Sequence, residues 1–287
     1  MSLSSFDLDM IRKLVRERAG IVLGADKSYL VESRLQPVAK AANLDSLETL
    51  CLRLRSQPHS VLHRQVVEAM TTNETLFLRD AHPFETLTKT LLPQLIPKRS
   101  ANKRLTIWCA ACSTGQEPYS VAMLIREQHP ALLAWQLRLV ATDIASEVLA
   151  KAGSATYSQL EVSRGLPPAL MNRYFTKIPT GDWKLSEDVR KMVEFRELNL
   201  LESYGAIGTA DIVMMRNVLI YFDVETKRQI LAKVRRVLAP DGFLFLGGAE
   251  TTMGIDENFE RLTQDRGGCY RLKSAVFPQA QTPSATG

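Results

Sequence analysis

From residue 105 onward the chain alternates short apolar runs with amphipathic segments, and this alternation constrains the fold more than any other feature. The runs "LTIWCA" (105–110) and "LRLVATDI" (137–144) predict strands, and each precedes a segment of helical periodicity, "EPYSVAMLIREQ" and "ASEVLAKAG". The pattern returns with "MVEFRELNL", "ADIVMMRN" (210–217), "ETKRQILAKVRRVL" and "FLFLGG". This order of strands and helices predicts an α/β domain with a parallel sheet over residues 105–273.

Two segments of this half of the chain depart from the rhythm. Residues 155–195 contain turns and short β-like runs, such as "GLPPAL" and "IPTGDWKL", that are too irregular for a crossover helix. We therefore expect a small inserted β-subdomain there. The tail, 274–287, has too little apolar content to pack and is predicted to be disordered.

The part of the chain before the sheet is helical in pattern. Residues 1–75 carry apolar side chains at three- and four-residue spacing, with Gly20 after the first periodic segment and Pro37 interrupting the second. These residues predict an N-terminal helical bundle. Residues 76–104 read as a linker helix with Pro83 near its first turn, followed by the basic connector "PKRSANKR".

Composition sets the outer bounds. The chain has 287 residues, of which 45% are hydrophobic, so a packed core is available. Neither a run of about 18 apolar residues nor an apolar signal core is present, so we expect a cytoplasmic protein without direct membrane insertion. The formal net charge of +5 would attract nucleic acid, an anionic surface or a carboxylate-rich protein, without choosing among them.

The segment "IWCAACSTGQEPYS" (107–120) holds two thiols, Cys109 and Cys112, at a spacing that fits a redox pair, a metal pair or the two sides of a turn. A zinc site would need a second pair of ligands. Cys51, Cys269 and the four histidines offer no second closely spaced pair, so no metal site is predicted.

Ligands of open parallel sheets bind beyond the carboxyl ends of the strands, where this same turn lies. Its only glycine is Gly115, and G-x-G-x-x-G is absent, which disfavours a pyrophosphate cofactor. Glu117 would repel a phosphate and attract an ammonium group, and Asp143 ends the second strand, where it could accept hydrogen bonds from a ribose. Each acid alone could instead cap a helix. Together they favour S-adenosylmethionine, and Arg216 and Asn217 emerge at the same edge after the buried run "DIVMM".

Five separated motifs resemble one family. "TTNETLFLRD", "CSTGQEPYS", "ATDI", "LNLL" and "RNVLIYF" are similar in order and spacing to those of CheR, the chemotaxis-receptor glutamate O-methyltransferase of bacteria, over residues 5–273. The resemblance implies a Rossmann-like, S-adenosylmethionine-dependent methyltransferase domain. It implies methyl transfer to glutamate side chains of chemotaxis receptors (methyl-accepting chemotaxis proteins) during adaptation, with S-adenosylhomocysteine as the product.

The resemblance also assigns residues. Asn73, Thr75 and Arg79 would contact the cofactor, and the guanidinium of Arg79 suits the methionine carboxylate. Asn199 and Leu200 would lie on the adenine side, although an ordinary strand end would have the same pattern. The predicted cofactor contacts are Asn73, Thr75, Arg79, Glu117, Asp143, Asn199, Leu200, Arg216 and Asn217.

Catalysis would depend on aligning a carboxylate oxygen of the substrate with the methyl group on the cofactor's sulfur. A glutamate side chain has a pKa of about 4.3 and is ionised at neutral pH, so methyl transfer to it needs no general base. Tyr221 is predicted to orient that carboxylate by its hydroxyl and, with Arg79, forms the predicted catalytic pair; the alternative for Tyr221 is simple packing on the sheet. With this reading, Cys109 is a small buried strand residue and Cys112 part of the cofactor turn. One departure is Ala111, where the family commonly has glycine.

The substrate would be a receptor helix rich in Glu and Gln. Basic residues of the bundle are predicted to meet it, although they could be scattered solvated charges: Arg34, Lys40, Arg53, Arg55 and Arg64. The inserted subdomain has only Gly181 in its turn "IPTGDWKL", so we expect weak or no docking on a receptor's C-terminal pentapeptide.

Two other functions remain open at this point. A nucleic-acid methyltransferase fits the positive charge, but the chain lacks interleaved aromatic residues and an N/D-P-P-Y/F motif after the fourth strand, so no nucleic-acid partner is expected. A non-catalytic module that senses the cofactor is the other alternative. The presence of both Arg79 and Tyr221 argues against it.

Overall fold

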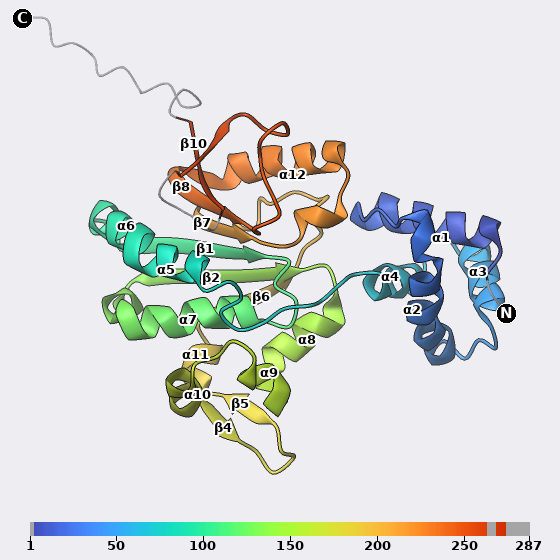
Figure 1. Ribbon diagram of the computed structural model, residues 1–287, viewed down its shortest axis with the longest axis horizontal. Helices are drawn as coiled ribbons and strands as arrows, with labels where there is room; N and C mark the ends of the chain where they lie inside the picture. Colours follow the sequence, from blue (N-terminus) through green and yellow to red (C-terminus); the bar gives the residue numbers. More distant parts are fainter. Residues whose placement is uncertain (1–2, 263–267, 274–287) are drawn as a thin grey trace, which may run out of the picture.

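A computed structural model describes residues 3–262 and 268–273; the tail expected to be disordered, 274–287, lies outside this range. The predicted α/β class is confirmed by a central seven-stranded sheet of order β6-β2-β1-β7-β8-β10-β9 (Figure 1). The first five strands in that order are parallel, and β10 is antiparallel to both of its neighbours. Their bounds are β1 Arg104–Ala110, β2 Gln136–Asp143, β6 Val193–Glu197, β7 Ala210–Met215, β8 Leu238–Leu246, β9 Phe259–Arg261 and β10 Cys269–Leu272.

Both faces of the sheet are covered, which explains why its central strands are apolar throughout. In β1, Ile107 and Cys109 pack with helix α7 (Gln116–Gln128), while Trp108 and Ala110 join the core under α12 (Val224–Val237). Figure 1 shows α7 and α8 (Ser146–Ser154) on one side of the sheet and α12 on the other. A short 3-10 turn, η3 (Pro130–Ala134), leads from α7 to β2.

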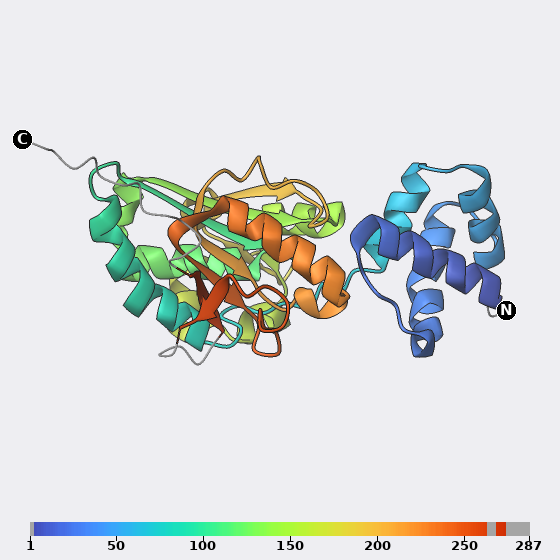
Figure 2. The same ribbon diagram turned by 90° about the horizontal axis from the view of Figure 1, so that it is seen from above.

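The predicted helical bundle is present at one end of the elongated molecule (Figure 2). It comprises α1 (Ser5–Ala19), the turn η1 (Ala25–Lys27), α2 (Ser28–Ala41), α3 (Leu47–Ser56) and α4 (Val61–Ala69). The predicted interruption at Pro37 is wrong, because α2 continues through it. Leu35 and Ala39, on either side of Pro37, are buried in the bundle, so packing outweighs the missing hydrogen bond.

An irregular segment leads from the bundle to the sheet and crosses the sheet's edge (Figure 1). Residues 72–76 have no regular structure, and a nearly continuous helical stretch follows from 82 to 99. It consists of α5 (His82–Thr86), a π-helical turn η2 (Leu87–Leu91) and α6 (Leu92–Arg99), whose apolar side chains pack on the α7 face of the sheet. None of the helices in the described ranges has both the length and the apolar content required to cross a membrane.

The segment after α8 builds a second, three-stranded antiparallel sheet of order β3-β5-β4. Its strands are β3 (Thr156–Tyr157), β4 (Phe175–Lys177) and β5 (Trp183–Leu185). The short helices α9 (Gln159–Ser163) and α10 (Pro168–Tyr174) connect β3 to β4, and α11 (Glu187–Arg190) leads from β5 to β6. Residues 193–195, placed by the sequence in the insertion, pair with β2 in the main sheet. A strand of mixed polarity at the sheet edge has no apolar run that would mark its start.

Candidate active site

A cleft opens at the carboxyl ends of the parallel strands, and one side of it is closed by Ala19, the last residue of α1, and by Ile21 in the segment that follows. The space between its walls is about 910 Å³, part of it open to solvent. Every residue predicted to bind the cofactor lines this cleft, as does Tyr221, whereas none of the five basic bundle residues does. The structure therefore brings together side chains from five regions of the sequence. What each of them binds stays a prediction.

The turn after β1 is tightly wound. Ala111 and Ser113 have positive φ of 54° and 51°, and Gly115 has a φ of 92°. A side chain at Gly115 would place its Cβ 3.0 Å from the Cβ of Ala152, so glycine is required there. The left-handed backbone at Ala111 explains why glycine suits this position, since an L-residue there is strained by about 1–2 kcal/mol.

Asp143 holds this turn against the end of β2. Its Oδ2 accepts a hydrogen bond from the Ser113 N–H (2.8 Å) and its Oδ1 from the Ala145 N–H (3.0 Å). Burial raises the pKa of Asp143, and the backbone amides partly offset that increase. Each carboxylate oxygen has a further lone pair, so the group can still accept hydrogen bonds from a ligand in the cleft.

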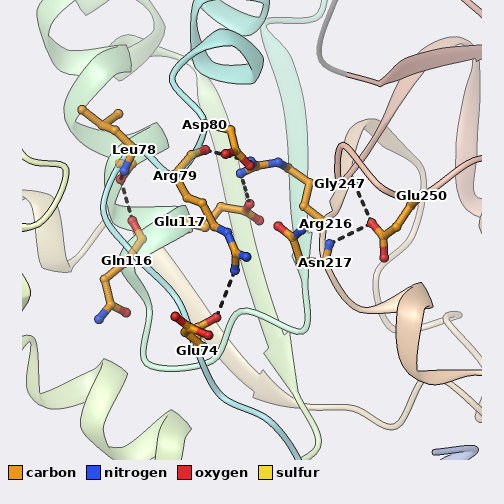
Figure 3. Close-up of polar contacts among 11 residues, drawn as sticks. Glu74, Leu78, Arg79, Asp80, Gln116, Glu117, Arg216, Asn217, Gly247 and Glu250 are labelled. Atoms are coloured by element: carbon orange, nitrogen blue, oxygen red, sulfur yellow. Dashed lines mark hydrogen bonds and ion pairs between the residues drawn. The ribbon is translucent and has the colours of Figure 1, made fainter. Parts of the chain in front are cut away.

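Glu117 forms a buried ion pair with Arg216 (Figure 3). Arg216 Nη1 lies 2.9 Å from Glu117 Oε2, and its Nη2 donates to the Arg79 carbonyl (2.7 Å) and to Asp80 (3.0 Å). Its guanidinium also lies over the Phe84 ring, 5.5 Å from the centroid. Burial raises the pKa of Glu117, and Arg216 opposes this increase. The contacts of Arg216 thus support Glu117 and the 79–80 turn.

The segment that carries Arg79 is tied to the cofactor turn. Ser113 Oγ donates to the Asn73 carbonyl (2.7 Å), and Arg79 Nη1 donates to the Glu74 carbonyl (3.2 Å). Leu78 and Asp80 both have positive φ, 50° and 55°. Figure 3 shows Arg79 lying beside Glu117, with its guanidinium directed toward Glu74. Non-glycine residues in this conformation concentrate at functional sites.

The predicted adenine-side residues lie where the bundle meets the sheet. Asn199 Nδ2 donates to the Arg18 carbonyl (2.6 Å), and its Oδ1 accepts from the Leu201 N–H (3.0 Å). Leu200 is buried. Apolar residues that the sequence did not predict complete this wall: Ile21, Ile144, Leu198 and Phe222. Ile144, Leu198 and Phe222 belong to the motifs "ATDI", "LNLL" and "RNVLIYF". No local pattern marks Ile21, which reaches the wall by a β-bridge to Phe222, 201 positions away in the sequence.

Tyr221 ends the 3-10 turn η4 (Leu219–Tyr221), which follows β7 after three residues. Its ring packs against the core that joins the bundle to the sheet, and its carbonyl accepts a hydrogen bond from the Val22 N–H (2.9 Å). Among the hydrogen bonds of residues 3–262 and 268–273, none uses the Tyr221 hydroxyl. That hydroxyl is therefore available to a ligand in the cleft.

The basic residues predicted to meet a substrate divide into two groups. Arg34 donates to the carbonyls of Met70 and Thr71, and Arg55 and Arg64 form ion pairs with carboxylates of the same chain. Lys40 and Arg53 are exposed on α2 and α3.

The thiols of Cys109 and Cys112 are buried, and burial raises both pKa values well above the usual one for cysteine. Such thiols stay protonated at neutral pH and are poor nucleophiles. Within the described part of the chain, no group of three or more His, Cys, Asp or Glu side chains is placed to hold a metal ion.

Comparison with protein-family models gives two adjacent matches. Residues 7–71 match "CheR methyltransferase, all-alpha domain", and residues 73–267 match "CheR methyltransferase, SAM binding domain". The chain belongs to the CheR methyltransferase family. The sequence-based predictions of this family, of a methyltransferase and of S-adenosylmethionine as its cofactor are confirmed.

Curated CheR-family relatives are similar along nearly their whole length. Chemotaxis protein methyltransferase 1 of Pseudomonas aeruginosa is 43% identical over 95% of this chain and 100% of its own. Chemotaxis protein methyltransferase Cher2 of Pseudomonas putida is 40% identical over the same shares. A solved complex of the glycopeptide N-methyltransferase MtfA with S-adenosylmethionine shows a weaker likeness: 15% identity over 67% of this chain and 58% of that one, with a TM-score of 0.36.

Proposed function

We propose that this protein transfers the methyl group of S-adenosylmethionine to glutamate side chains in the cytoplasmic helical domains of chemotaxis receptors, forming methyl esters during adaptation. The observation that carries the proposal is the convergence, in one cleft, of two acids, a cation and a tyrosine hydroxyl without a protein partner. Family membership supports the chemistry, and the names of the relatives support chemotaxis.

The chemistry of the cleft fits this cofactor. Glu117 suits the ammonium group, Asp143 the ribose hydroxyls and Arg79 the methionine carboxylate, while two acids would repel a phosphate. The apolar wall near Ile21 and Leu200 suits an adenine ring. When bound, S-adenosylmethionine supplies an electrophilic methyl group on a positively charged sulfur.

The protein's own residues then provide alignment. The substrate glutamate arrives ionised, so no side chain has to remove a proton. Tyr221 donates its hydroxyl hydrogen bond to one carboxylate oxygen and thereby directs the other oxygen along the line of attack. Positioning of this kind is worth effective molarities of about 10⁵ M or more. The bundle wall limits the entry of water, which would otherwise solvate the carboxylate.

Each part of the chain has a proposed task. Residues 1–75 meet the receptor helix, and 76–104 connect the two domains and supply Arg79 to the cleft. Residues 105–273 carry the other groups of the cleft, with 155–195 as the inserted subdomain. Of the five basic residues proposed for substrate contact, Lys40 and Arg53 are best placed, because they project to solvent.

We also propose that pentapeptide tethering is not used. The turn joining β4 to β5 is closed by hydrogen bonds from Ile178 N–H to the Asp182 carbonyl (2.8 Å) and from Gly181 N–H to the Ile178 carbonyl (2.9 Å). So short a turn offers little main chain to a peptide strand. Calorimetry with such a pentapeptide should detect weak or no binding, and a Kd at or below about 1 μM would contradict this.

A labelled-methyl assay separates the candidate functions. The protein and labelled S-adenosylmethionine are incubated with receptor-containing membranes, with RNA, or without an acceptor, beside a Tyr221→Phe variant. We expect label on the receptor alone and less of it with the variant. Label on RNA would favour a nucleic-acid methyltransferase, and cofactor binding without transfer to any acceptor would favour a sensing module.

A further inference from the structure

The carboxylate of Glu250 accepts hydrogen bonds from three backbone amides near Tyr221. Figure 3 shows two of these contacts, those with Asn217 and Gly247. Glu250 Oε2 accepts from the N–H groups of Asn217 (2.8 Å) and Gly247 (2.5 Å), and its Oε1 accepts from the Ile220 N–H (3.2 Å). Glu250 is 8% exposed and does not line the cleft. One buried side chain thus joins the end of β7 and the turn η4 to the end of β8.

Glu250 clamps the turn formed by residues 217–221. The backbone of this clamped turn is unfavourable and would not hold its shape by itself. Asn217 has a φ of 58°, in the left-handed region. The amide of Asn217 follows the end of β7, and that of Ile220 lies in the first turn of η4, so both need an acceptor outside these elements. Glu250 supplies that acceptor to both.

Tyr221 directly follows the clamped amide of Ile220. On its other side, its carbonyl accepts from the Val22 N–H of the bundle. The main chain at Tyr221 is therefore held from two directions, by Glu250 and by the segment after α1. Since a tyrosine hydroxyl lies far from its Cα, a small rotation of this turn moves the hydroxyl by a larger distance.

Space at the clamp is limited. A Cβ on Gly247 would lie 2.6 Å from Asn217 Nδ2 and 2.8 Å from Glu250 Oε2. Only glycine allows the end of β8 to approach the turn this closely. Gly247 and Glu250, which both lie outside the cleft, therefore pack closely against the turn that carries Tyr221.

We propose that Glu250 is a positioning residue for methyl transfer: its carboxylate holds the 217–221 turn so that the Tyr221 hydroxyl meets the substrate carboxylate. This inference rests on the proposed role of Tyr221. Glu250 acts through the turn and not by contact with either ligand. Glu250→Gln keeps the shape, but one oxygen becomes an NH₂ donor, so at least one of the three amides loses its acceptor.

A double-mutant cycle tests the connection to Tyr221. Methyl transfer to a receptor cytoplasmic fragment is measured for Glu250→Gln, Tyr221→Phe and the double variant, together with the Kd for S-adenosylhomocysteine. We expect Glu250→Gln to lower kcat about tenfold in the wild-type background and less than about twofold in the Tyr221→Phe background, with Kd little changed. Equal losses of kcat in both backgrounds would overturn the proposal, as would full activity of Tyr221→Phe.

Amide hydrogen exchange tests the clamp without reference to activity. In Glu250→Gln, peptides covering 217–222 should exchange at least about tenfold faster than in the wild type. Unchanged protection there would overturn the clamp, whatever the assay shows. Glu257→Gln is the matched control, because Glu257 is exposed and, within residues 3–262 and 268–273, accepts a hydrogen bond only from the Gly254 N–H (2.9 Å). Its kcat and its exchange at 217–222 should not change.

Discussion

Arg216 and Glu117 form an ion pair, with 2.9 Å between Nη1 and Oε2, whose members are 2% and 13% exposed. The acid proposed to bind the cofactor's ammonium group thus has a resident counterion, which favours its ionised form. The same guanidinium donates a hydrogen bond to the Arg79 carbonyl. The positions of Glu117 and of the segment that carries Arg79 therefore both depend on the Arg216 side chain.

Arg216→Met should be strongly destabilising. It leaves Glu117 buried without its partner, and breaking a buried pair in this way lowers the free energy of unfolding by about 3–5 kcal/mol. Urea unfolding at pH 7 measures the effect. Arg228→Met, which removes an exposed pair with Glu225, should change it by less than about 1 kcal/mol. Similar losses for both variants would contradict the buried-pair interpretation.

Cofactor affinity should fall on acidification. Burial raises the pKa of Glu117 above its ordinary 4.5 and that of Asp143 above its ordinary 3.8. A cationic ammonium group binds ionised Glu117, so protonation weakens binding, and the loss begins at a higher pH than for an exposed carboxylate. Because the folded pKa values lie above the unfolded ones, these two acids do not themselves make the fold acid-labile.

Calorimetry with S-adenosylhomocysteine from pH 8 to pH 5 measures this dependence. Glu117→Gln removes one of the two titrations, so its affinity should be lower at pH 8 and vary less with pH. An identical pH profile in the wild type and the variant would show that Glu117 does not contact the ammonium group.

Asp143→Asn should weaken cofactor binding and the fold together. The amide keeps one acceptor oxygen, so either the Ser113 or the Ala145 N–H loses its partner, which lowers stability by about 1–3 kcal/mol. We expect an affinity loss of at least about tenfold, since the ribose also loses a charged acceptor. Asp188→Asn, at an exposed site, is the control. An unchanged Kd for Asp143→Asn would refute the ribose assignment.

Ala111→Gly should stabilise the protein or leave it unchanged. Glycine relieves a left-handed strain of about 1–2 kcal/mol but loses about 0.5–1 kcal/mol through the flexibility of the unfolded chain. Ala150→Gly, at an exposed interior position of α8, relieves no such strain and should only destabilise. Thermal unfolding of the two variants distinguishes the cases, and a lower Tm for Ala111→Gly than for Ala150→Gly would show that Ala111 is unstrained.

The strands and the position of the cleft could be predicted from the sequence because local patterns determine them. A strand such as β1, covered on both faces, leaves an apolar run, and the residues directly after β1, β2 and β7 must meet at one edge of the sheet. Helices α9 and α11, of five and four residues, are too short to show a helical period.

The remaining features depend on partners distant in sequence. Ile21 reaches the cleft by its bridge to Phe222, and two of the three amides that donate to Glu250 lie 30 and 33 positions earlier in the sequence. Arg34 looked like a surface cation, yet its acceptors lie on the loop after α4. Composition and spacing contain no information about such pairings.

The central claim is that receptor glutamates receive the methyl group, and mass spectrometry of the acceptor tests it most directly. A receptor cytoplasmic fragment is incubated with the protein and S-adenosylmethionine, digested, and sequenced by fragmentation before and after mild alkali. We predict one added methyl group on glutamate residues, lost as methanol in alkali, as an ester requires. A methyl group that survives alkali, or that resides on any other residue type, would contradict the account.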